Sequence, residues 1–175
     1  MEGKVWREDD MLGFFRGKGK RKENKKENII YTPCKGIVVP ITEVPDPVFS
    51  EKVLGDGFAV IPAEGKIYAP TDGEVTLVFD TLHAVTMTTG SGVEILIHIG
   101  LDTVTLNGEP FTAHVAAGDQ VKKGDLIMDV DLDKIGAAGL NCITPVLICN
   151  TDDYNEITIL KEGAASPEDA VLRIV

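Results

Sequence analysis

The sequence lacks the features that would place the protein in a membrane or outside the cell. No window approaches the ~20 consecutive apolar residues that a bilayer-spanning helix needs. The first ten residues hold no apolar run and no small-residue cleavage site, so we expect no secretory signal. The three cysteines, Cys34, Cys142 and Cys149, have neither metal-like nor redox-like spacing. We therefore expect free thiols and a cytoplasmic location.

Motifs of several enzyme classes are also missing. No Gly-x-Ser-x-Gly occurs, which argues against a Ser-His-Asp hydrolase. No His-x-His or His-Glu-x-x-His occurs, so a zinc hydrolase built on His83, His98 and a nearby aspartate is an alternative without a motif to support it. The third histidine, His114, lies in a polar stretch. A biotin or lipoyl carrier modified at residues 122–123 would lack the methionine neighbours expected for biotin.

Charge is divided unevenly along the 175 residues, which carry a net −11. Residues 1–30 hold nine Lys or Arg against six Asp or Glu, a net of +3, whereas residues 31–175 hold eight against twenty-two, a net of −14. So acidic a body is a poor nucleic-acid binder, because contacts with phosphates supply most of that affinity. It suits docking of basic partner proteins.

The basic end has its own pattern. Residues 16–28 are poor in apolar side chains and predict a disordered linker. Before them, residues 11–15 read Met-Leu-Gly-Phe-Phe, which indicates either an unstructured tail or a weak membrane-surface anchor assisted by the basic run. We assign residues 1–29 to a flexible tail and residues 30–175 to one domain.

The domain is predicted to be all-β. Eighteen glycines and nine prolines interrupt short β-type runs, and helical periodicity is confined to residues 132–140. Two segments, Thr32-Pro-Cys-Lys-Gly-Ile-Val38 and Ala69-Pro-Thr-Asp-Gly-Glu-Val75, share Pro-x-x-Gly-x-Val and predict an internal pseudo-duplication. The expected architecture is an antiparallel sandwich or barrel of the duplicated hybrid type. The predicted strands are residues 37–40, 58–62, 73–79, 83–88, 93–99, 126–131, 144–149 and 156–160.

Two histidines fall in one predicted hairpin. A turn centred on Gly90 and Ser91 would pair residues whose numbers sum to 181, which places His83 opposite His98 on one face. The alternation assigns the isoleucines near His98 to the core face, and assigns Val85 and Leu96 to the histidine face.

Such a pair can have a chemical role. Over an apolar patch both imidazoles are costly to charge, so one neutral ring can attack phosphorus while the other donates to the phosphoryl oxygens. The residues alone leave an inert pair equally open.

Longer matches then point to a family. The quoted segments are Phe49-Ser-Glu-Lys-Val-Leu-Gly-Asp-Gly-Phe-Ala-Val, Ala69-Pro-Thr-Asp-Gly-Glu-Val, Leu82-His-Ala-Val and Glu94-Ile-Leu-Ile-His-Ile-Gly-Leu-Asp-Thr-Val. Over roughly residues 36–160 the chain resembles the glucose-type enzyme IIA component of the bacterial phosphoenolpyruvate-dependent sugar phosphotransferase system. The His-x-Gly-x-Asp-Thr-Val signature, with a second histidine fifteen positions earlier, carries most of the resemblance.

The resemblance implies a phosphotransferase component with an antiparallel β-sandwich fold. It implies that His98 is phosphorylated on Nε2, that His83 supports transfer and that Thr81 hydrogen-bonds His83. The implied donor is the histidine phosphocarrier HPr, and the implied acceptor is a cysteine on the IIB domain of a sugar permease. No cofactor is implied for transfer.

Other implied roles concern partners. Asp102 is implied at the rim of the active face, and we expect Asp46 and Glu51 to meet cationic residues of the donor. A regulatory role through other proteins can coexist with transfer, and there His83 and His98 would share a zinc ion with a partner. A purely regulatory binding module is the competing hypothesis.

Overall fold

The protein is described by a computed structural model over residues 26–175, and strands make up most of its regular structure. The predictions for residues 1–25 lie outside the described residues. The first strand, β1 (Asn28–Tyr31), begins slightly before the predicted domain boundary at residue 30. The domain therefore includes the end of the segment that was predicted to be a linker.

The largest element is an eight-stranded antiparallel sheet. In order across the sheet its strands are β13 (Gly163–Ala165), β2 (Gly36–Pro40), β3 (Asp56–Pro62), β11 (Thr144–Ile148), β7 (Glu94–His98), β6 (Ala84–Thr88), β5 (Gly73–Val78) and β9 (Gln120–Val121).

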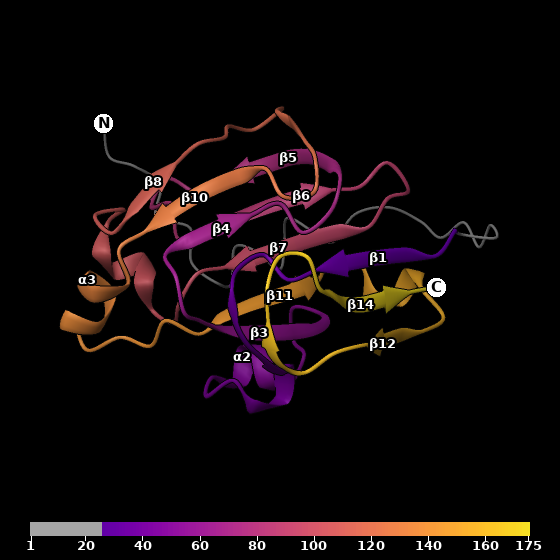
Figure 1. The fold of residues 1–175 in the computed structure, drawn as a ribbon, viewed down its shortest axis with the longest axis horizontal. Coiled ribbons are helices and arrows are strands. Elements are labelled where there is room, and N and C mark those ends of the chain that lie inside the picture. The colour runs from indigo at the N-terminus through magenta and orange to yellow at the C-terminus, as the bar shows by residue number, and fades with distance from the viewer. Residues whose placement is uncertain (1–25) are drawn as a thin grey trace.

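Two three-stranded antiparallel sheets pack against one face of the large sheet (Figure 1). The first consists of β1, β14 (Ala170–Ile174) and β12 (Ile157–Ile159), and the second of β4 (Lys66–Tyr68), β10 (Leu126–Val130) and β8 (Phe111–Ala113). The predicted antiparallel β-sandwich is confirmed. Every predicted strand coincides with an observed one, whereas β1, β4, β8, β9, β13 and β14 were not predicted.

Helices are short. The predicted helical turns form α3 (Leu132–Ala137), which begins where the Asp131 side chain accepts from the backbone N–H of Lys134. A second helix, α2 (Pro47–Ser50), follows the 3-10 turn η1 (Ile41–Glu43). Two further 3-10 turns are η2 (Thr103–Leu106) and η3 (Thr151–Asp153).

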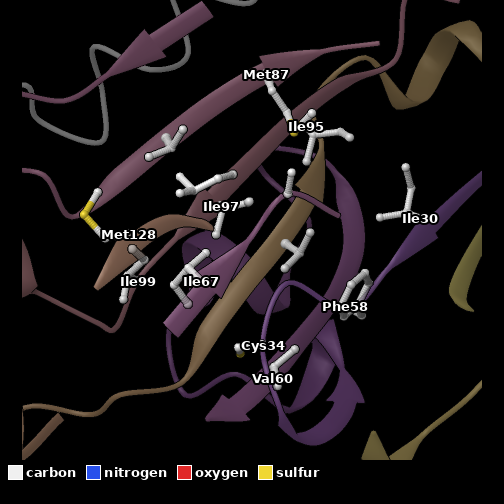
Figure 2. Close-up of a cluster of buried hydrophobic side chains, with 14 of the residues drawn as sticks. Ile30, Cys34, Phe58, Val60, Ile67, Met87, Ile95, Ile97, Ile99 and Met128 are labelled. Atoms are coloured by element: carbon white, nitrogen blue, oxygen red, sulfur yellow. The ribbon is translucent and has the colours of Figure 1, made fainter. Parts of the chain in front are cut away.

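The buried apolar side chains form two clusters on opposite faces of the large sheet. The inner core lies between the large sheet and the two small ones, and Figure 2 shows Ile95 and Ile97 of β7 among side chains such as Ile67 and Met128. We call the cluster on the other face the outer cluster. Its members are Ile41, Val44, Phe49, Leu54, Ala59, Phe79, Ala84, Leu96, Leu101, Ile143 and Leu147.

The predicted pseudo-duplication is visible in a reciprocal pair of hydrogen bonds. The backbone N–H of Tyr31 donates to the carbonyl of Pro70 at 2.9 Å, and that of Tyr68 donates to the carbonyl of Pro33 at 2.7 Å. The sequence repeat has a spacing of 37 residues, so Tyr31 corresponds to Tyr68 and Pro33 corresponds to Pro70. Each repeat thus donates from its tyrosine N–H to the proline carbonyl of the other repeat. The two small sheets repeat the same arrangement of three strands.

Two further expectations concern membranes and thiols. Within residues 26–175 no helix is long and apolar enough to cross a bilayer. All three cysteines are free thiols, and burial raises the pKa of the Cys34 thiol to about 12.

Candidate functional site

The two histidines lie at the same end of the β6–β7 hairpin. His98 is the last residue of β7, and His83 directly precedes β6. The predicted register is wrong by one residue, since Ala84 rather than His83 lies opposite His98. The cause is the turn, which holds three residues between the paired Thr89 and Val93 and is closed by Gly92 at φ +90°.

The register error carries a second correction. Val85 belongs to the inner core, so its placement on the histidine face was wrong. Leu96 lies on the histidine face as predicted, within the outer cluster. Val85 is 1% exposed and Leu96 is 0% exposed.

His83 reaches the outer face because it does not follow the strand's alternation. It sits in the turn between β5 and β6, directly after Leu82, whose φ is +58°. Its carbonyl accepts from the backbone N–H of Ile99 at 2.7 Å, which ties this turn to the end of β7. The two rings therefore meet even though their backbones are not directly opposed.

The histidine rings contact each other edge to face. Their centroids are 5.1 Å apart with an interplanar angle of 82°. Phe49 of α2 packs on His98 with a centroid distance of 4.9 Å, and Phe79 packs on His83 at 5.4 Å. Only 2% of His83 and 1% of His98 is exposed. The pair is thus walled by two phenylalanines to which the sequence analysis gave no role.

One nitrogen of each ring is held by a neighbouring oxygen. Nδ1 of His98 lies 2.8 Å from the carbonyl oxygen of Gly100, and Nδ1 of His83 lies 2.6 Å from Oγ1 of Thr81. A carbonyl oxygen only accepts, so Nδ1 of His98 carries the proton and the lone pair of the neutral ring is on Nε2. Sequence reasoning found Thr81 but missed Gly100, whose contribution is a backbone atom.

Both rings are neutral at pH 7. Burial is the main cause that lowers the pKa of His83 to about 3, and its neighbour His98 lowers it further. Burial also lowers the pKa of His98 to about 4, although the Gly100 carbonyl and the carboxylates of Asp46 and Asp102 act in the opposite direction. Two neutral imidazoles side by side can supply a nucleophile and a hydrogen-bond donor.

The predicted acidic residues surround the pair at different depths. Asp102 is exposed directly beyond β7, in the left-handed conformation at φ +57°. Asp46 is half-buried and begins α2 by accepting from the backbone N–H of Val48 at 3.0 Å. Glu51 is exposed at the end of α2. Of these carboxylates, Asp46 and Asp102 raise the pKa of His98.

The structure adds no metal ligands to the histidine pair among the residues that it describes. Residues 26–175 hold no group of three or more His, Cys, Asp or Glu side chains that could bind a metal ion. His114 contacts Asp129 of β10, with Nε2 2.6 Å from Oδ2. A zinc ion at His83 and His98 would need further ligands from a partner.

Comparison with known proteins identifies the context of this site. The family model of the phosphoenolpyruvate-dependent sugar phosphotransferase system, EIIA 1, matches residues 28–154. The glucose-specific EIIA component of Oceanobacillus iheyensis is 45% identical over 163 residues, which cover 92% of this chain and 99% of that protein.

Longer relatives contain a similar region. The beta-glucoside-specific EIIBCA component of Bacillus subtilis is 48% identical over 146 residues, which cover 83% of this chain but only 24% of that protein. Among solved structures, glucose permease IIA from Mycoplasma capricolum matches with a TM-score of 0.80 at 36% identity, covering 87% of this chain and 99% of that one.

Proposed function

Because the chain belongs to the EIIA 1 family of the phosphoenolpyruvate-dependent sugar phosphotransferase system, we propose that His98 is the residue on which it carries a phosphoryl group. The family is one of phosphocarriers, and the chain is accordingly a transferase component of sugar transport whose transfer chemistry needs no cofactor. A purely regulatory module and a zinc hydrolase are not favoured by these relatives. The observation that carries the assignment to His98 is its Nδ1–Gly100 hydrogen bond, which directs the lone pair to Nε2.

The transfer step follows from the tautomer. The neutral Nε2 of His98 attacks the phosphorus of the donor's phosphohistidine in line, so that one P–N bond forms as the other breaks. The donor is HPr, and in the second step the acceptor is a cysteine thiolate on a IIB domain. No net oxidation occurs in either step.

His83 assists without carrying the group. For this role the Thr81 hydroxyl, 2.6 Å from Nδ1 of His83, acts as the donor, so that the proton of the ring lies on Nε2 and can be donated to the phosphoryl oxygens. Phe49 and Phe79 exclude water from the labile P–N bond. Because the rings are almost fully covered, a partner reaches them only by pressing its surface against this face.

The carboxylates near His98 imply that a partner protein supplies the positive charge needed for phosphoryl transfer. Asp46 and Asp102 disfavour further negative charge beside His98, so cationic side chains of the partner must balance the transferring phosphoryl group. Glu51 adds to the same acidic rim from the end of α2. The glucose-specific names of two relatives support a permease of the glucose type as the acceptor.

The assignment of His98 is tested by incubating the protein with phosphoenolpyruvate, enzyme I and HPr and mapping acid-labile phosphate. We expect His98→Ala to remain folded and accept none. His114→Ala is the matched control, since His114 is exposed and contacts Asp129 rather than the pair. Normal labelling of the His98 variant would overturn the assignment.

The location of the protein stays a separate proposal. We place it in the cytoplasm, with residues 11–15 touching the inner face of the membrane. Co-sedimentation with anionic liposomes should weaken steeply as salt rises, since the attraction is screened over ~8–10 Å. Deletion of residues 1–25 should abolish it while sparing β1, which begins at Asn28. Equal sedimentation of the deletion variant would refute the anchor.

A further inference from the structure

A buried threonine beside the active histidine has no part in the chemistry described so far. Thr103 is the first residue of η2 and is 0% exposed. Its Oγ1 donates to the carbonyl of Ile99 at 2.5 Å, across the loop that follows β7. A buried hydroxyl is retained where its hydrogen bond is satisfied, and here that bond closes the loop holding Gly100.

The methyl group of Thr103 lies close to the same loop. A Cβ added to Gly100 would lie 2.6 Å from Cγ2 of Thr103 and 2.9 Å from the carbonyl oxygen of Asn141. The backbone at Gly100 is therefore clasped between Thr103 and Asn141, in a left-handed conformation at φ +75° that favours glycine. The Thr103 hydroxyl fixes the peptide before Gly100. The peptide after Gly100 is held by the backbone N–H of Leu101, which donates to the carbonyl of Asn141 at 2.9 Å.

The clasped residue supplies the oxygen that orients the reactive ring. The Gly100 carbonyl is the acceptor for Nδ1–H of His98 at 2.8 Å. If this carbonyl turns away, the hydrogen bond that favours the Nδ1–H tautomer is lost. The ring would then populate both tautomers, as a neutral imidazole does in water, and the lone pair would no longer be confined to Nε2. In metal sites, the group that hydrogen-bonds the second ring nitrogen of a ligating histidine fixes its tautomer and orientation, and its loss lowers metal affinity or activity.

We propose that Thr103 is a positioning residue, which holds the Gly100 carbonyl against His98 and thereby keeps the Nε2 lone pair available for phosphoryl transfer. The proposal rests on the proposed function of His98 and deepens it. The Thr103 hydroxyl donates to the Ile99 carbonyl and not to the reacting atoms. Its effect passes through the Ile99–Gly100 peptide.

The test compares variants that differ by the hydroxyl alone. Thr103→Val replaces the hydroxyl by a methyl group of similar size, and the pair Thr103→Ser and Thr103→Ala differs only by the hydroxyl. Thr105→Val is the matched control, because the Thr105 hydroxyl also donates to a backbone carbonyl of the same turn, that of Asp102 at 2.7 Å, but is exposed. The readouts are the His98 tautomer by ¹⁵N NMR without phosphate, and the rate and ring position of phosphorylation by phospho-HPr.

We expect the Nδ1–H tautomer to dominate in the unmodified protein, in Thr103→Ser and in Thr105→Val. In Thr103→Val and Thr103→Ala we expect both tautomers, with transfer about tenfold slower, which is the scale of one lost hydrogen bond. A single Nδ1–H tautomer in Thr103→Val, or in Thr103→Ala should the valine variant not fold, would overturn the proposal. The proposal would also be overturned if Thr105→Val lost the Nδ1–H tautomer preference and slowed transfer as much as Thr103→Val does.

The two proposals fail in different ways. If the unmodified protein is not labelled on His98, the proposed function is wrong, yet the tautomer measured without phosphate still decides the role of Thr103. If His98 is labelled normally and its tautomer is the same with and without the Thr103 hydroxyl, only the positioning role is wrong.

Discussion

Acidification should destabilise this protein mainly through the buried histidine pair. The folded-state pKa values, about 3 for His83 and about 4 for His98, lie below the ~6.5 of an unfolded chain. The unfolded state therefore binds protons first as pH falls, so stability is complete above pH ~6.5 and is lost down to the folded-state values. Between pH 7 and pH 5 each histidine removes about 2 kcal/mol, and the pair about 4 kcal/mol.

That loss is large against the 5–15 kcal/mol typical of a domain, and urea unfolding followed by far-UV circular dichroism can measure it. With a slope of about 2 kcal/mol per molar urea, the midpoint should fall by roughly 2 M between pH 7 and pH 5. The double variant His83→Gln/His98→Gln should lose most of this pH dependence, whatever its stability at pH 7. His114→Gln, which leaves the pair intact, should keep it.

The comparison within each variant separates titration from packing. A glutamine buried among Phe49 and Phe79 lowers stability at both pH values, whereas proton uptake by the pair lowers it only at pH 5. If the double variant loses as much stability on acidification as the unmodified protein, the histidines are not buried and neutral in the folded state.

Three further predictions concern the surroundings of the pair. His83→Gln should still be labelled on His98 by phospho-HPr, but passage to a IIB cysteine should slow by roughly 10²–10³; failure of labelling would refute the division of roles. Gly100→Ala should lower the free energy of unfolding, measured in urea, by at least about 2 kcal/mol, because φ is positive and a Cβ would be crowded. Gly90→Ala, where the space around a Cβ is open, should change it by no more than roughly 0.5 kcal/mol. Asp46→Ala should lose about 1 kcal/mol with its helix cap; Asp46→Asn should keep the cap but reduce the salt dependence of HPr binding, and an unchanged dependence would exclude this carboxylate from docking.

The histidine hairpin was the most predictable part of the fold, and its error has a local cause. Alternation of apolar residues placed β7 correctly and assigned Leu96 and His98 to one face. The register depended on counting turn residues, and Gly92 in the left-handed region adds one residue to the loop. A single residue was enough to exchange the faces of the partner strand, as Val85 shows.

Other features depend on contacts between distant segments and could not be predicted from local patterns. β14 carries a short apolar run, but its assignment as a strand depends on pairing with β1, far away in the sequence. Phe49 meets His98 only because α2 folds over the outer face of the large sheet. The role of Gly100 comes from a carbonyl oxygen, which every residue possesses, so only geometry reveals it.

The pairing of β1 with β14 also makes the domain portable. Asn28 lies directly opposite Ile174, so the two ends of the folded unit leave side by side from one small sheet (Figure 1). A chain entering and leaving at one edge can be spliced into a longer polypeptide, or circularly permuted, without threading through the core. His83 and His98 lie on the opposite face of the large sheet, away from such linkers. The same geometry suits relatives in which the matched region is only 20–24% of the whole protein.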